Sequence, residues 1–64
     1  MPPDDWGQLE IISALLEDLH HRRLFAEKMG NFSRAKELGR EIMAAQARRN
    51  RLIEQITARL VDAP

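Results

Sequence analysis

The sequence contains no cysteine, and its 64 residues include only three glycines and three prolines. Without cysteine the chain can form neither a disulfide nor a zinc site built on thiolates. A domain this short buries only about 60% of its unfolded surface, so we expect its own core to be marginal. Because cysteine-based cross-links are excluded, the additional stabilisation is expected to come from association with another chain.

An excess of charge of either sign is also absent. Ten basic and ten acidic side chains give a formal net charge of +0, so no global field draws the protein to nucleic acid or to an anionic membrane. Glu10, Glu17 and Asp18 interrupt the apolar stretches well before the roughly 20 residues that cross a bilayer. The acidic, proline-containing start differs from a secretory signal peptide. These features predict a cytoplasmic protein without a membrane partner.

Motifs that carry catalysis are scarce as well. The sequence has no glycine-rich phosphate loop, no cysteine nucleophile and no strand pattern that could hold a nucleophile elbow. Two helices alone enclose no pocket for a substrate. We therefore interpret the chain as non-enzymatic, with no catalytic residues, no metal ligands and no cofactor.

The sequence does contain two long helical patterns. They predict a single all-α domain over residues 1–64, with helices at about 6–29 and 32–61 joined by a turn at 30–31. Gly30 enters the left-handed backbone conformation of a helix C-cap without strain, and Asn31 can cap the second helix. Asp4 or Asp5 can cap the first helix. Pro64 is expected to end the second helix.

Each helical pattern carries an apolar stripe. At about 100° per residue, the stripe of the first helix consists of Leu9, Ile12, Leu15, Leu16, Leu19 and Ala26, with Ile11 and Met29 at its edge. The stripe of the second helix consists of Phe32, Ala35, Leu38, Ile42, Ala45, Leu52, Ile53, Ile56 and Leu60.

Folding the chain back about the turn sets the stripes against each other. The expected register brings Ala26 to Ala35 and Leu19 to Ile42, and it sets Glu10 beside Arg51 and Glu27 beside Arg34. Small residues near the centre of the second helix, Gly39 among them, are expected to let the helices approach closely. Two helices leave one side of each stripe open to water. We therefore expect a homodimeric four-helix bundle, or docking on the helices of a larger protein.

Leu24 and Phe25 do not fit the stripe of the first helix. If the stripe runs through Leu19 and Ala26, these two side chains point elsewhere. Together with Trp6 they could form an exposed apolar patch that binds a partner or a second copy. The alternative is that the helix bends and Phe25 covers the turn beside Phe32.

Glu17 and His20 have the Glu-x-x-His spacing that places two metal ligands on one helix face, and the expected register brings Glu41 close to His20. Such a group could assemble a di-metal centre across a dimer. However, Glu17 and His20 lie far round the helix from its apolar stripe. We therefore interpret them as a solvated face with a hydrogen bond from His20.

The segment Arg48-Arg49-Asn50-Arg51 is a compact basic run on a helix, which could contact nucleic-acid phosphates. The expected register sets it against Glu10 and the acidic N-terminus, and no aromatic side chains are interleaved for base stacking. Local ion pairing is the preferred interpretation. A small nucleic-acid-associated regulatory protein is kept as the alternative function.

The turn and the start of the second helix resemble the UVR-type hairpin of the excision-repair proteins UvrB and UvrC over residues 26–42. Matching positions are Asn31, Phe32, Ala35, Leu38, Glu41 and Ile42, whereas Lys36 and Gly39 depart from the pattern. Tetratricopeptide and MIT-type helices begin similarly. The UVR resemblance implies a protein-docking module that pairs with a like hairpin, with Phe32 and Leu38 in the packed seam.

Together these observations predict a protein–protein interaction module that self-associates or docks a partner through its apolar stripes. Arg22, Arg23 and Arg49 lie near the stripes and would select the register by pairing with carboxylates of the partner. The residues predicted to bind a partner are Trp6, Leu24, Phe25, Phe32, Leu38, Arg22, Arg23 and Arg49.

Overall fold

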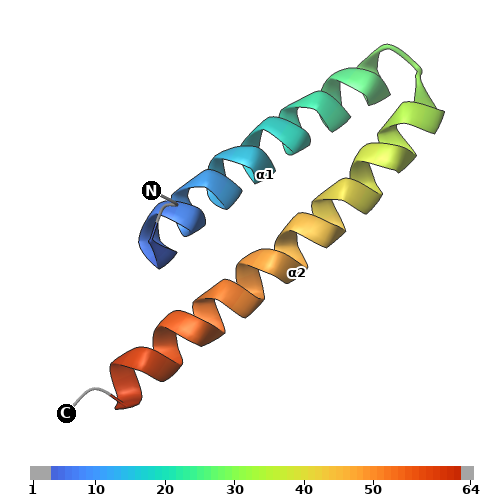
Figure 1. Ribbon diagram of the computed structural model, residues 1–64. Helices are drawn as coiled ribbons and strands as arrows, with labels where there is room; N and C mark the ends of the chain where they lie inside the picture. The colour runs from blue at the N-terminus through green and yellow to red at the C-terminus, as the bar shows by residue number, and fades with distance from the viewer. Residues whose placement is uncertain (1–3, 63–64) are drawn as a thin grey trace.

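The protein is an antiparallel helical hairpin (Figure 1). The computed structural model describes residues 4–62, with α1 at Asp5–Lys28 and α2 at Phe32–Asp62. The hairpin measures 53 × 20 × 15 Å, and residues 4–62 contain no strand. The predicted all-α hairpin is therefore confirmed. The expected helix stop at Pro64 lies outside the described residues.

A side-chain cap begins α1. The Oδ1 atom of Asp4 accepts a hydrogen bond of 2.7 Å from the backbone N–H of Gly7, which satisfies one of the N–H groups that the first helical turn leaves unpaired. The acidic side chain of Asp5 lies in this first turn, where the positive end of the helix dipole favours negative charge. Of the two predicted capping residues, Asp4 is the one that caps.

The turn closes with a Schellman motif. The backbone N–H of Asn31 donates to the carbonyl of Ala26 at 2.8 Å, and that of Gly30 donates to the carbonyl of Glu27 at 3.1 Å. This pair of hydrogen bonds requires a left-handed residue at the corner, and Gly30 has a φ of 74°. The Oδ1 atom of Asn31 then accepts from the N–H of Arg34 at 3.2 Å and caps α2. The predicted roles of Gly30 and Asn31 are both confirmed.

The core is a narrow seam between the two helices. Its buried residues recur at intervals of seven in α1 and of three, four or seven in α2, the heptad spacing of a coiled coil. The buried members are Ile12, Leu19 and Ala26 from α1 and Ala35, Leu38, Ile42, Ala45, Leu52 and Ile56 from α2. Leu38, at 1% exposure, is the most deeply buried large side chain.

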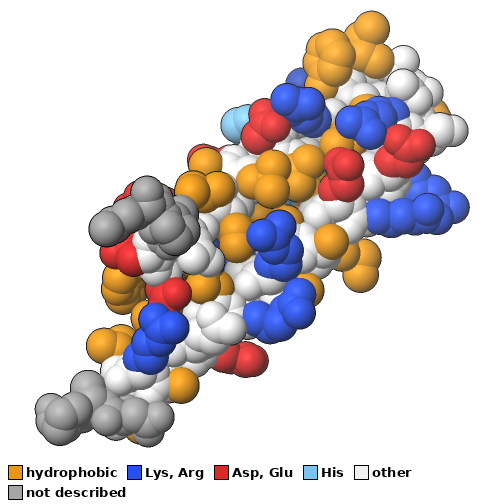
Figure 2. Space-filling model, in the orientation of Figure 1, with side chains coloured by type: hydrophobic (Ala, Val, Ile, Leu, Met, Phe, Trp, Pro, Cys, Tyr) orange, Lys and Arg blue, Asp and Glu red, His pale blue; other side chains and the backbone are white. Residues whose placement is uncertain are grey.

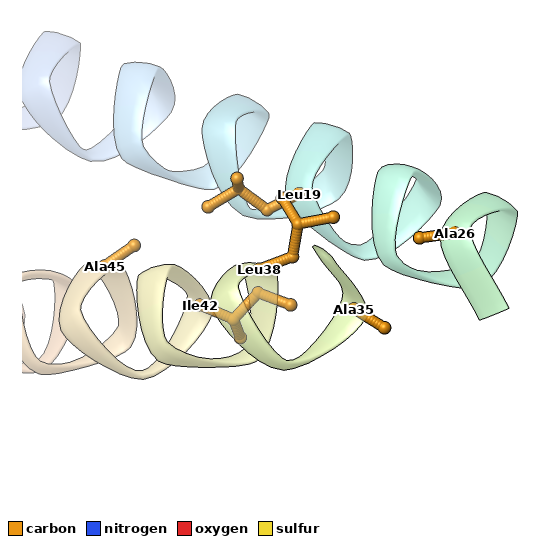
Figure 3. Close-up of a cluster of buried hydrophobic side chains, with 6 residues drawn as sticks. All are labelled: Leu19, Ala26, Ala35, Leu38, Ile42 and Ala45. Atoms are coloured by element: carbon orange, nitrogen blue, oxygen red, sulfur yellow. The ribbon is translucent and has the colours of Figure 1, made fainter. Parts of the chain in front are cut away.

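The seam is divided into two clusters. In the cluster nearer the turn, the side chain of Leu38 reaches from α2 toward Leu19 of α1, and Ile42 belongs to the same cluster (Figure 3). The second cluster joins Ile12 to Leu52 and Ile56 near the open end. The membership of the clusters agrees with the register expected from the sequence.

Three residues of the expected stripes lie outside this seam. Leu15, Phe32 and Leu60 are exposed, because one neighbouring helix covers only the seam positions of an α-helix and not a stripe that spreads further round it. Arg23 and Arg49, which were expected to lie near the stripes, instead occupy seam positions at the three-and-four spacing. Arg23 remains exposed and Arg49 is half-buried.

Candidate interaction surface

Large apolar side chains remain exposed over much of the described hairpin. Figure 2 shows hydrophobic side chains reaching the surface from the turn end to the open end, between groups of both charges. The exposed set comprises Trp6, Ile11, Leu15, Leu24, Phe25, Met29, Phe32, Met43, Leu60 and Val61. Scattered exposed hydrophobic residues are normal, whereas a large exposed apolar proportion in a small chain makes its surface a candidate for association.

The exposed apolar residues lie on both sides of the seam. On one side, Leu15 and Arg22 line a shallow groove with Glu41 and Arg48 of α2. The groove continues toward the turn past Phe25 and Met29. We call this the Leu15 side. It combines apolar side chains from α1 with charged side chains from α2.

On the opposite side, which we call the Met43 side, a second groove runs between the helices. His20 and Arg23 of α1 line it with Phe32, Met43 and Gln46 of α2. At the open end of the hairpin, Trp6 and Leu60 line a smaller depression together with Ile56. The apolar content of the Met43 side comes mainly from α2.

The predicted patch of Trp6, Leu24 and Phe25 does not form. Trp6 lies in the first turn of α1 and Phe25 in its last, about 28 Å apart along the axis at 1.5 Å per residue. Leu24 and Phe25 are adjacent positions and therefore point about 100° apart. Phe25 lines the Leu15 side and Phe32 the Met43 side, so Phe25 does not cover the turn beside Phe32.

Two of the three predicted register-selecting arginines pair within their own helix. The Nε atom of Arg22 lies 2.8 Å from Asp18, and that of Arg23 lies 3.3 Å from Glu27. Both pairs are exposed and join positions one turn apart. Arg49 is half-buried, and none of the carboxylates of residues 4–61 forms an ion pair with it.

Arg23 lies beside Gly39 of α2. A Cβ atom built on Gly39 would be 3.8 Å from Cζ of Arg23, an ordinary van der Waals separation. The absence of a side chain at Gly39 therefore does not bring the two backbones together, contrary to the expectation from the small residues of α2. Of the small residues at the centre of α2, Ala45 is the one buried in the seam, whereas Ala44 and Ala47 are exposed.

The expected ion pairs between Glu27 and Arg34 and between Glu10 and Arg51 are not formed. Glu27 pairs with Arg23, and Arg34 pairs with Glu37 at 3.1 Å. Partners one turn away in the same helix are held close by the helix itself, whereas a pair across the seam must order two long side chains. Within residues 4–61 one ion pair does join the helices, between Asp5 and Arg59 at the open end.

The basic run of α2 is spread around the helix. Arg48 lines the Leu15 side near Glu41, Arg51 lies further toward the open end beside Gln8 and Leu52, and Arg49 occupies the seam. In the described part of the chain neither Arg48 nor Arg51 forms an ion pair. Local ion pairing, the preferred interpretation of this run, is therefore not what the structure shows.

The residues considered for a metal site do not come together. His20 lines the Met43 side, whereas Glu41 lines the Leu15 side, so the expected proximity of His20 and Glu41 is wrong. No group of three or more histidine, aspartate or glutamate side chains suited to a metal ion occurs among residues 4–61.

Leu38 and Phe32, which the UVR resemblance places in a packed seam, differ in their exposure to solvent. Leu38 fills the hairpin's own core and offers almost no surface to a partner. Phe32 is 70% exposed and does not pack into the seam between α1 and α2. Of this pair, Phe32 alone can contact another chain.

Comparison with known proteins identifies no relative. The chain matches no protein-family model, no curated protein and no solved structure. What the fold defines is a class, the antiparallel two-helix hairpin. Neither α1 nor α2, over their described residues, contains an apolar segment long enough to cross a membrane.

Proposed function

We propose that this protein is a non-enzymatic interaction module that self-associates, or docks on a larger protein, through its exposed apolar side chains. The observation that carries the proposal is the exposure of Phe25, Met29 and Phe32, each about two-thirds accessible to solvent around the turn. Burying an aliphatic or aromatic side chain of this size contributes about 1.5–3 kcal/mol. Several such residues can outweigh the roughly 4–15 kcal/mol that association costs.

A four-helix bundle made from two hairpins is the simplest assembly of this kind. It would cover one side of the seam of each chain. The charged residues on that side would then select the partner and the register, because a misplaced like-charge pair opposes association. Arg22 and Arg49 are suited to this role, Arg22 because it lies among the apolar residues of the Leu15 side and Arg49 because it lacks a carboxylate partner in residues 4–61. Arg23 adds a charge on the Met43 side.

The test is the solution mass, measured by light scattering at two concentrations, together with the helix content at each. Self-association predicts that mass and helicity rise with concentration, and that replacing Phe25 and Phe32 by serine lowers the mass. Ala47→Ser, an exposed position of α2, is the matched control. A wild-type chain that stays monomeric and fully helical at micromolar dilution, and that retains no protein from its native extract, would contradict the proposal.

Neither Arg48 nor Arg51 forms an ion pair with residues 4–61, which favours a second candidate, a small nucleic-acid-associated regulatory protein. Nucleic-acid binding that depends on phosphate contacts loses affinity as the salt concentration rises, and each further contact makes this dependence steeper. Salt-dependent binding to DNA or RNA that Arg48→Ala weakens, with the circular dichroism spectrum unchanged, would support this function. A solution mass that nucleic acid leaves unchanged favours the interaction module.

A further inference from the structure

A second apolar row runs along α1, separate from the seam. It lies on the Leu15 side, roughly a third of a turn from the seam at 100° per residue, and its positions recur at alternating intervals of four and three. Its members, in chain order, are Ile11, Leu15, Asp18, Arg22, Phe25 and Met29. We call them the outer row. The four apolar members are all exposed, and no element of the described chain covers them.

The outer row has the same pattern in both directions. From either end it presents two apolar residues and then one charged residue, with the midpoint level with His20. A helix with such a row is complementary to a second copy of itself running antiparallel. Ile11 would then meet Met29 of the second copy, and Leu15 would meet its Phe25. Alternating four-and-three spacing is the pattern that lets side chains interlock between two helices.

The charges at the centre complement each other in the same register. Asp18 would face Arg22 of the second copy, and two-fold symmetry repeats that pair, so that four charges alternate in sign around the axis. Within one chain Asp18 and Arg22 already lie 2.8 Å apart, which holds both side chains on this face. A parallel arrangement would instead set Asp18 against Asp18 and Arg22 against Arg22.

We infer that the occupant of the outer row is a second copy of this chain, with α1 antiparallel to α1 about a two-fold axis level with His20. This inference rests on the proposed function and specifies its partner and geometry. On α2 the flanking positions of the Leu15 side, Arg34, Glu41 and Arg48, are charged. They would form a polar rim around the apolar contact, the usual arrangement of an interface.

Charge variants test the arrangement directly. Asp18→Arg places only positive charges at the centre, and Arg22→Asp places only negative ones. Each variant alone should dimerise about tenfold more weakly or worse, because like charges then face each other. Mixed in equal amounts, the two variants should form a heterodimer, seen by native mass spectrometry. Neither variant retains the Asp18–Arg22 pair within its own chain. Recovered dimerisation in the mixture can therefore come only from charge pairing between the two chains.

Glu17→Arg is the matched control, since it makes the same charge change at the neighbouring exposed position of α1, away from the outer row. It should leave the dimer dissociation constant within about twofold of the wild type. Equal weakening by Glu17→Arg and Asp18→Arg would overturn the inference.

Cysteine cross-linking tests the direction of the helices, because the natural sequence has no cysteine. A chain carrying Ile11→Cys should form a disulfide with a chain carrying Met29→Cys more readily than either variant forms one with itself. Preferential self-linking of each variant would show parallel helices and overturn the inference. A dimer indifferent to both charge variants would overturn the outer row as the interface but leave the proposed function intact. A strictly monomeric wild-type chain would overturn this inference, and it would overturn the proposed function as well only if the chain also retained no protein from its native extract.

Discussion

The carboxylate of Asp5 accepts a hydrogen bond from the guanidinium of Arg59, 54 positions further along the chain. This ion pair joins the start of α1 to the end of α2. The side chain of Asp5 is only 18% exposed, whereas that of Arg59 is 72% exposed. At the turn end, the chain itself and the Schellman motif hold the two helices together. At the open end, the contact between the helices depends on this ion pair and on the apolar contacts near Ile56.

Replacing Arg59 by alanine should lower the free energy of unfolding by less than about 1 kcal/mol, because a largely exposed ion pair is screened by water and salt. Faster amide hydrogen exchange should be confined to the first turn of α1 and the last turns of α2. The measurement is urea unfolding at one fixed protein concentration, with exchange followed by NMR. Arg40→Ala, at an exposed position with no ion pair in the described chain, is the control. A decrease of more than about 2 kcal/mol in the free energy of unfolding would show that the pair stabilises more of the hairpin than its open end.

Gly39→Ala should stabilise the hairpin by about 0.5–1 kcal/mol, because alanine restricts the unfolded chain and favours the helix. The added Cβ would meet Arg23 at 3.8 Å, which requires no displacement. Thermal and urea unfolding followed by circular dichroism measure the change. The reverse substitution at an exposed position of the same helix, Ala47→Gly, should cost a similar amount. A destabilised Gly39→Ala protein would mean that the space beside Arg23 is needed by the fold or by an assembly.

Gly30→Ala should destabilise the protein by about 1–2 kcal/mol, since a residue with a side chain is strained at a φ of 74°. No atom lies within 4 Å of the position that the new Cβ would occupy, so the cost comes from the backbone alone. Gly30→Asn should lose less, because asparagine tolerates the left-handed region. If urea unfolding shows that both variants lose the same free energy of unfolding, the destabilisation has a steric origin instead.

Leu38→Ala should lower the free energy of unfolding by about 2–5 kcal/mol, the range for removing a fully buried leucine. Leu38 is 1% exposed and fills the cluster nearer the turn. For so small a domain this loss approaches the whole stability, so circular dichroism at 25 °C should show a partly unfolded chain. Met43→Ala, at an exposed position five residues further along α2, should change stability by no more than about 0.5 kcal/mol. Comparable losses at the two positions would contradict the location of the core.

Much of the fold could be predicted from the sequence because the strongest local signals agree. Gly30 and Asn31 each have a backbone role that few other residues satisfy, and the apolar residues between Leu9 and Ile56 set the register. The width of the core could not be predicted from a stripe drawn at 100° per residue. One partner helix covers only the positions at three-and-four spacing, which leaves Leu15, Phe32 and Leu60 exposed.

The candidate surface was predicted less completely than the fold. Phe25 was correctly singled out as a residue that does not fit the seam, but its grouping with Trp6 ignored the length of α1. The outer row was not predicted, although it is visible in the spacing of Ile11, Leu15, Phe25 and Met29. It can be recognised only after the seam is known, because both patterns share one helix. The ion pairs were predicted across the seam, whereas the helix itself supplied nearer partners for Glu27 and Arg34.

Residues 4 and 62 lie at the same end of the hairpin, away from the turn (Figure 1). A fluorophore attached near the start of α1 would therefore report how two hairpins are arranged lengthwise. In the antiparallel dimer the two dyes would be separated by roughly 45 Å, from the 1.5 Å rise per residue on either side of His20. Hairpins stacked in the same direction would bring the dyes next to each other, so that energy transfer between them would be nearly complete.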